Sequence, residues 1–171
     1  MADIHLGNGK RDLCYHSIMS AYQMARLVGP CDELARYAAY LSAFLVLEQL
    51  RYGSSFRLLA QSRMYAEEAL STLKREKASG FADYEADMLV RYRCSKYALH
   101  SAEWKMASKL LSKTRWISDF LLRDIMYNKI IRLQLAVAYF RGKLGTIVRE
   151  TTTWLNVSRY SIDHAKRKSA S

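Results

Sequence analysis

The chain has 171 residues, of which half are hydrophobic, 12% are aromatic and 25% are charged. This balance excludes intrinsic disorder for the chain as a whole. One proline and seven glycines are too few for a turn-rich β-sandwich or β-barrel. The 27 basic and 16 acidic residues give a net charge of +11, and three widely spaced cysteines exclude a disulfide framework. We therefore expect a basic helical protein of a reducing, intracellular compartment, nuclear or cytoplasmic.

Apolar residues recur at helical spacing along the chain, and no stretch shows the period of two expected of a strand. Gly29 and Pro30 end the first helical stretch. Asp32 and Asp83 stand where caps for later helices belong, and residues 112–118 are expected to form a connection. The predicted helices cover residues 13–28, 34–48, 58–73, 84–99, 103–111, 119–140 and 146–168.

No linker rich in proline, glycine or serine interrupts these helices, so residues 1–171 are expected to form one helical-repeat domain. Residues 1–11 lack the apolar core of a signal peptide and are expected to be flexible, as is the tail over residues 166–171. The longest apolar stretch, residues 38–47, is shorter than the roughly 20 residues that span a bilayer. We expect no membrane partner.

Partial internal repeats predict how the helices pack. Trp104 and Ala107 stand where a tetratricopeptide repeat has an aromatic and then a small residue at the start of its second helix, and Leu111 follows one turn later. Residues 65–70 and 135–139 show similar patterns of large and small residues. The sequence therefore predicts an all-α fold of antiparallel helical hairpins, a tetratricopeptide-like repeat array of about seven helices.

Several segments together resemble a known family. Residues 90–97, running on to residues 107–111, look like the early repeats of subunit seven of the anaphase-promoting complex, and residues 135–153 resemble the next repeat. The N-terminal region also resembles that family: Tyr15, His16 and Ser17 precede a short helical stretch that bears leucine and alanine, and the helix over residues 65–70 follows. The connection between Leu111 and Leu135 is longer than in the family, and the loop before Ala82 is shorter.

This resemblance implies a scaffold subunit of a multi-subunit ubiquitin ligase that acts in cell-cycle control. Its partners would be other subunits of the complex, and its N-terminal helices would form a homodimer. The ligase chemistry would lie in other subunits, so the resemblance implies no catalytic residue in this chain.

The residues that commonly carry chemistry are not arranged for it. Cys14, Cys31 and Cys94 stand far apart, with no CxxC or HxxxH spacing, so we predict no metal site and interpret the cysteines as small buried residues. Residues 7–10 lack the GK[ST] ending of a phosphate-binding loop. We predict no enzyme activity and no cofactor.

Basic residues in the second half predict a binding face. The functional interpretation is a surface for an acidic protein segment or, as the alternative, for RNA in a ribonucleoprotein-assembly protein. An ordinary solvated face explains the same pattern. If the face binds an acidic partner, Arg91→Glu with Arg93→Glu should weaken that partner and leave the fold intact. The residues of this predicted face are Arg91, Arg93, Lys96, Lys105, Lys109 and Lys113.

Aromatic residues in the first half form the second predicted surface. Tyrosine is enriched at protein interfaces, and a dimer can cover the end of a helical array. The alternative is that these side chains fill the core of a hairpin. The predicted self-association face comprises Tyr15, Tyr22, Tyr37, Tyr40 and Phe44.

Overall fold

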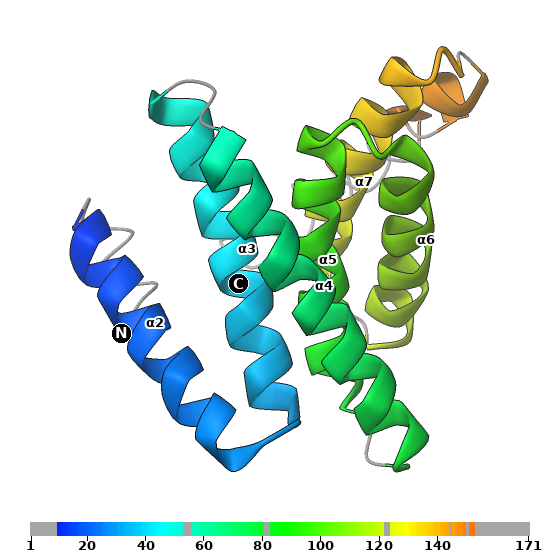
Figure 1. The fold of residues 1–171 in the computed structure, drawn as a ribbon. Coiled ribbons are helices and arrows are strands. Elements are labelled where there is room, and N and C mark those ends of the chain that lie inside the picture. The colour runs from blue at the N-terminus through cyan, green and yellow to red at the C-terminus, as the bar shows by residue number, and fades with distance from the viewer. Residues whose placement is uncertain are drawn as a thin grey trace, which may run out of the picture.

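Six long helices follow one another in the computed structural model (Figure 1), which describes residues 10–52, 56–80, 83–121, 124–143, 145–149 and 151–152. No strand occurs in these segments, so the prediction of an all-α fold is confirmed for them. Residues 145–149 and 151–152 are also helical. The long helices are α2 (Arg11–Val28), α3 (Asp32–Tyr52), α4 (Phe56–Ala78), α5 (Tyr84–His100), α6 (Trp104–Phe120) and α7 (Asp124–Phe140).

The two predicted helix caps differ in outcome. Asp83 is confirmed as the cap of α5, because its Oδ1 accepts the backbone N–H of Glu85 at 2.8 Å. Asp32 is not a cap but the first residue of α3. Cys31 takes the capping role there, because its Sγ accepts the backbone N–H of Leu34 at 3.4 Å.

The predicted connection over residues 112–118 is wrong. Helix α6 continues through these residues to Phe120, so Asp119 lies near its end and does not begin the next helix. The prediction failed because the helix carries small hydroxyl residues at buried positions where apolar residues were expected. The Thr114 hydroxyl donates a hydrogen bond to the Leu110 carbonyl at 2.8 Å, which satisfies this polar group inside the helix. The buried residues keep helical spacing throughout: Ala107, Leu110, Leu111, Thr114, Ile117 and Ser118.

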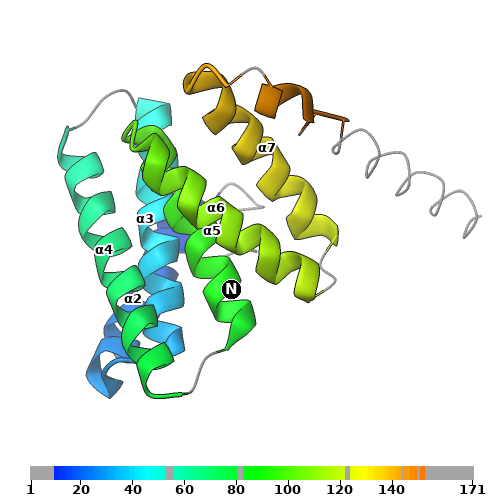
Figure 2. The same ribbon diagram turned by 90° about the vertical axis from the view of Figure 1, so that its right-hand side faces the viewer.

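Neighbouring and alternate helices both pack together. Helix α3 packs along α4, and α5 packs along α6, as two antiparallel hairpins. Helix α3 also contacts α5, and α5 contacts α7, so these three alternate helices form one layer. Helix α2 lies against α3 at one side of the array, and α7 lies against the α5–α6 hairpin at the other (Figures 1 and 2).

Small residues allow the first hairpin to close tightly. The hydroxyls of Ser42 on α3 and Ser62 on α4 lie 3.1 Å apart, and Ser62 also donates to the Ser42 carbonyl at 2.9 Å. Both side chains are fully buried, so this pair satisfies its polar atoms within the interface. Five alanines of the same two helices are also fully buried: Ala35, Ala38, Ala39, Ala66 and Ala69.

The residues that suggested repeats lie in α4 (residues 65–70), in the α5–α6 hairpin and in α7 (residues 135–139). Ser95, Ala107 and Leu111 are buried between α5 and α6. Trp104 stacks on Phe140 of α7, with ring centroids 4.9 Å apart. The predicted flexible tail over residues 166–171 and most of the predicted flexible N-terminus lie outside the described residues, although Arg11 already belongs to α2.

Candidate functional site: a basic groove on alternate helices

A groove of about 300 Å³ lies where α3, α5 and α7 meet. Because these are alternate helices of the array, their exposed sides face a common space. We call this space the α3–α5–α7 groove. It is lined by Tyr40, Ala43, Phe44, Leu47, Leu89, Tyr92, Arg93, Lys96, Met126 and Lys129.

Two cations of the groove lie against tyrosine rings. The guanidinium carbon of Arg93 on α5 lies 4.2 Å from the centroid of the Tyr40 ring on α3. The ammonium nitrogen of Lys96 lies 4.9 Å from the centroid of the Tyr92 ring, one turn earlier on α5. Such contacts favour a cation near a desolvated ring face. The rings therefore hold both cations at the groove.

Burial and like charges both shape the electrostatics of the groove. Burial of Lys96, together with the positive charges of Arg93 and Lys129, lowers the pKa of its ammonium group. Burial also raises the pKa of Tyr92, although nearby arginines oppose this shift. None of the ten lining residues is acidic. The groove thus combines an apolar floor, which includes Phe44 and Leu89, with three positive charges at its wall.

The predicted basic face is split by the structure. Arg93 and Lys96 lie at the groove, where Lys129 joins them. Lys105, Lys109 and Lys113 are exposed on α6 and do not line the groove. Lys113 lies 4.1 Å from the ring centroid of Trp116.

Arg91 has a structural role that sequence analysis missed. Its guanidinium pairs with the carboxylate of Asp87, which is fully buried, and Lys77 of α4 pairs with the same carboxylate. Reversing the charge of Arg91 would place a second carboxylate beside Asp87. The expectation that Arg91→Glu leaves the fold intact is therefore corrected, and Arg91 is unsuitable for testing the groove.

The predicted self-association face divides between core and groove. Tyr22 and Phe44 are each only 5% exposed and belong to the core, which favours the core-filling interpretation for both. Tyr15, Tyr37 and Tyr40 are half-buried against that core. The proposed dimer through these residues remains a prediction.

Tyr22 also carries an internal polar contact. Its hydroxyl donates to the Glu68 carboxylate at 2.5 Å, and its ring meets Tyr65 edge-on with centroids 5.3 Å apart. Burial, followed by the hydrogen bond to Glu68, raises the pKa of the Tyr22 hydroxyl well above its ordinary value. This side chain ties α2 to α4.

Sequence reasoning missed the contributions of Tyr40 and Lys129 to the groove. Tyr40 belongs to the predicted self-association face, and Lys129 is not part of the predicted basic face. A signal was present, because Tyr92, Arg93 and Lys96 share about one turn of α5. Only the contacts of α3 and α7 with α5 show which residues face that turn.

The net charge is unevenly distributed along the chain. Residues 1–91 contain eleven basic and eleven acidic residues, so their charges cancel. Residues 92–171 contain sixteen basic and five acidic residues and carry the whole surplus of +11. Two of the three groove cations come from α5 beyond this boundary, and the third comes from α7.

Searches for other kinds of site give negative results over the residues described. No group of three or more histidine, cysteine or acidic side chains is placed to hold a metal ion there. Among the same helices, none has both the length and the apolar character needed to cross a membrane. Among the described residues, none of the three cysteines forms a disulfide; Cys14 and Cys94 are fully buried as predicted, whereas Cys31 is only half-buried.

Comparison of the chain with models of known protein families, with curated proteins and with solved structures finds no match. The groove must therefore be interpreted from its own residues.

Proposed function

We propose that this protein is a non-enzymatic scaffold whose α3–α5–α7 groove binds an acidic segment of a protein partner. The observation that carries the proposal is the gathering of Arg93, Lys96 and Lys129 beside an apolar floor, with no acidic lining residue. Burial of Lys96, followed by the nearby positive charges of Arg93 and Lys129, lowers the pKa of its ammonium group and disfavours its charged form. An anionic partner would offset this effect and gain the complementarity that makes charged interfaces specific.

The stacking of the helices supports a tetratricopeptide-like array as the scaffold. In such arrays, hairpins stack so that alternate helices line one surface, which agrees with the contacts among α3, α5 and α7. The spacing departs from the 34-residue period of tetratricopeptide repeats. Helices α3, α5 and α7 begin at residues 32, 84 and 124, which are 52 and 40 residues apart. We therefore propose a helical-hairpin array with irregular repeats.

The resemblance to anaphase-promoting complex subunit seven remains a prediction from the sequence. It is tested by affinity capture of the tagged chain from cell extract, with nuclease and moderate salt, followed by mass spectrometry. Recovery of other subunits of that complex would support membership of the assembly. Their absence would leave the groove as the only basis for the scaffold function.

RNA is the competing partner class, and one feature of the groove disfavours it. Single-stranded nucleic acid is bound largely by stacking of bases on exposed aromatic faces. Arg93 and Lys96 already cover a face of Tyr40 and a face of Tyr92, respectively. The groove therefore presents its cations more than it presents stacking platforms.

The proposal is tested with two fluorescent probes, a short peptide that alternates glutamate with leucine or phenylalanine, and a short oligouridine RNA. We expect the peptide to bind more tightly. The double substitution Arg93→Gln with Lys96→Gln should weaken peptide binding by roughly tenfold or more, because each lost charged contact contributes about 1.5 kcal/mol or more. Fluorescence anisotropy at several salt concentrations provides the measurement.

A matched control separates the groove from general charge. Arg57 and Lys74 are exposed on α4 and do not line the groove, so Arg57→Gln with Lys74→Gln makes the same change in net charge. Equal loss of binding in both double variants would refute the groove. Tighter binding of the RNA than of the peptide, with loss in the groove variant, would replace the acidic segment with RNA as the partner.

A further inference from the structure

A second cavity, of about 190 Å³, lies between α6, the end of α7 and the helical residues 145–149. We propose that it binds a single phosphomonoester group. The proposed ligands are Arg141 and Lys143 with the hydroxyls of Ser108, Ser112 and Thr146, and Arg149 lines the same cavity. This inference is independent of the groove, whose lining shares no residue with this cavity.

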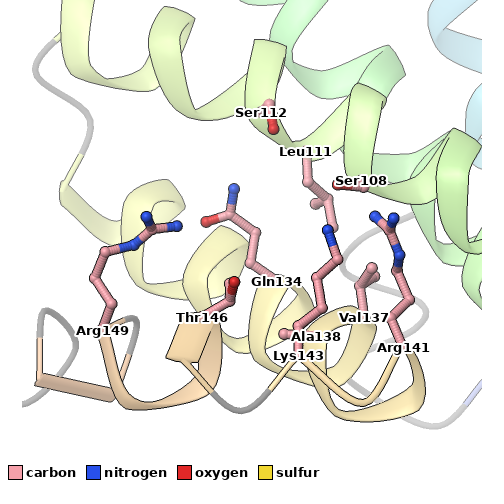
Figure 3. A pocket seen from close by; sticks show the side chains of 10 residues that line it. All are labelled: Ser108, Leu111, Ser112, Gln134, Val137, Ala138, Arg141, Lys143, Thr146 and Arg149. Carbon is pink, nitrogen blue, oxygen red and sulfur yellow. The ribbon is translucent and has the colours of Figure 1, made fainter.

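The side chains converge from three elements. Figure 3 shows Arg141 and Lys143 reaching from the end of α7 toward α6, where Ser108 and Ser112 face them. Arg149 extends into the same space from the helical residues 145–149 (Figure 3). The cations therefore lie around the cavity and not in one exposed row along a helix.

The backbone that carries two of the cations is fixed by a helix-ending motif. Gly142 has a φ of 64°, and its N–H donates to the Tyr139 carbonyl at 3.0 Å. The N–H of Lys143 donates to the Ala138 carbonyl, also at 3.0 Å. These two bonds define a Schellman motif, which reverses the chain just after Arg141. The motif holds Arg141 and Lys143 on either side of the turn.

A hydrogen bond from α6 fixes one further side chain that lines the cavity. Gln134 lines the cavity, and its Oε1 accepts a hydrogen bond from Arg115 of α6 at 3.3 Å. This bond fixes the Gln134 amide, which projects into the cavity in Figure 3. The apolar residues Leu111 and Val137 close the floor.

The size and chemistry of the cavity together indicate the ligand. Its volume is below the roughly 300 Å³ at which pockets begin to take drug-sized molecules, so it suits a small group and not a whole nucleotide. No acidic residue is among the ten that line it. A phosphomonoester offers up to two negative charges and three acceptor oxygens, which match two or more cations and several hydroxyl donors.

The group can come from a phosphorylated protein side chain or from a small phosphorylated molecule, and the experiment distinguishes them. The probes are inorganic phosphate, a short phosphoserine peptide and the same peptide without phosphate, each titrated by calorimetry and followed by phosphorus NMR. We expect the phosphoserine peptide and inorganic phosphate to bind and the unmodified peptide not to bind. Tighter binding of the phosphopeptide assigns the site to a protein partner, and tighter binding of inorganic phosphate assigns it to a small molecule.

The dependence on pH gives a second readout. The second ionisation of a phosphomonoester has a pKa near 6, whereas arginine and lysine stay charged well above that pH. Positive side chains such as Arg141 and Lys143 stabilise the dianion of the bound phosphomonoester. They therefore lower the pKa of its second ionisation relative to the free group. Phosphorus NMR should show a lower titration midpoint for the bound group than for the free group, and binding should strengthen as pH rises through about 6. An unchanged midpoint would refute the contact.

The variants test the assignment to this cavity. Arg141→Gln with Lys143→Gln should weaken binding roughly tenfold or more, the size of one lost charge-assisted hydrogen bond. The control Arg57→Gln with Lys74→Gln carries the same charge change on α4, and the groove variant Arg93→Gln with Lys96→Gln carries it in the groove. Both should bind the phosphopeptide like the unaltered protein. Equal loss in all three variants, or no binding by the unaltered protein, would refute the proposal.

A milder variant covers the case in which the charge variant does not fold. Ser108→Ala with Ser112→Ala removes two hydroxyl donors without changing the charge. We expect it to weaken binding about fivefold, as expected for neutral hydrogen bonds. Unchanged binding in this variant, together with equal binding of a phosphodiester such as oligouridine, would show that the cavity does not recognise a phosphomonoester.

Discussion

The two halves of this protein use the same kinds of charged residue differently. Residues 1–91 contain equal numbers of basic and acidic residues, and six ion pairs join residues of this half to one another. Residues 92–171 carry a surplus of eleven positive charges. The first half therefore uses charge mainly to join its own helices. The second half supplies the three cations of the α3–α5–α7 groove and the three cations of the smaller cavity.

The two arginines of α5 show the difference at close range. Arg91 pairs with buried Asp87, and through it with Lys77, so it fastens α5 to α4. Two residues later, Arg93 lies over Tyr40 at the wall of the groove. Neighbouring basic residues can thus belong to structure and to a binding surface, and charge counting cannot separate them.

The largest expected effect comes from removing the buried acid of the first half. Asp87→Ala leaves the charges of Lys77 and Arg91 without their shared partner, at an expected cost of about 3 kcal/mol in the free energy of unfolding. Both cations retain some exposure to water, which keeps the cost near the lower end of such losses. Urea unfolding provides the measurement. The exposed pair Arg63 and Glu67 is the control, because Glu67→Gln should leave the midpoint unchanged. A similar small effect for both variants would contradict the assigned role of Asp87.

Alkaline pH tests the burial of Cys94, which lies just beyond the boundary between the two halves. Cys94 is fully buried, and burial raises the pKa of its thiol to about 12. In the unfolded chain the thiol ionises near pH 8.5, so its contribution is fully present below that pH and is lost as pH rises toward 12. The free energy of unfolding should therefore fall by about 1.4 kcal/mol per pH unit from this group within that window. Urea unfolding between pH 8 and 11 should show that the free energy of unfolding falls less steeply with pH in Cys94→Ala than in the unaltered protein. An equal fall in both proteins would contradict the assigned contribution of the Cys94 thiol.

Two helix ends in the second half allow a smaller and reciprocal test. Ala102 after α5 and Gly142 after α7 both have positive φ, 56° and 64°, and both are followed by a bond that closes a Schellman motif. A residue with a Cβ is strained in this conformation. Ala102→Gly should therefore raise the free energy of unfolding by about 0.5–1 kcal/mol, and Gly142→Ala should lower it by a similar amount. No atom lies within 4 Å of a Cβ built at Gly142, so the cost there comes from the backbone alone. Thermal unfolding measures both, and changes of the same sign would contradict the motif.

The outcome for individual elements shows what sequence alone could predict. The C-terminal end of α2 and the start of α5 were predictable from the sequence. Gly29 has a local backbone preference that ends α2, and Asp83 forms the local hydrogen bond that caps α5. The continuation of α6 was not predictable, because Thr114 and Ser118 are polar in sequence but are buried in the fold, where α6 packs against α5 and α7.

The same distinction holds for the two sites. Arg93 and Lys96 could be identified as basic residues on one helix face. Their partner Tyr40 and the cavity around Arg141 depend on contacts between separate helices, which a single sequence does not reveal.

The smallest expected effect tests whether the surplus charge of the second half has a cost for folding. Lys105 and Lys109 are exposed on α6, in the region that carries the surplus. If that surplus repels itself in the folded state, Lys105→Gln with Lys109→Gln should stabilise the protein by up to about 0.5 kcal/mol at low salt. The gain should vanish near 1 M salt, where the Debye length falls to about 3 Å. The matched variant Arg57→Gln with Lys74→Gln lies in the balanced half and should give no gain. Urea unfolding at both salt concentrations measures the difference, and an equal gain for the two variants would show that the positive charge acts over the whole molecule and not in the second half alone.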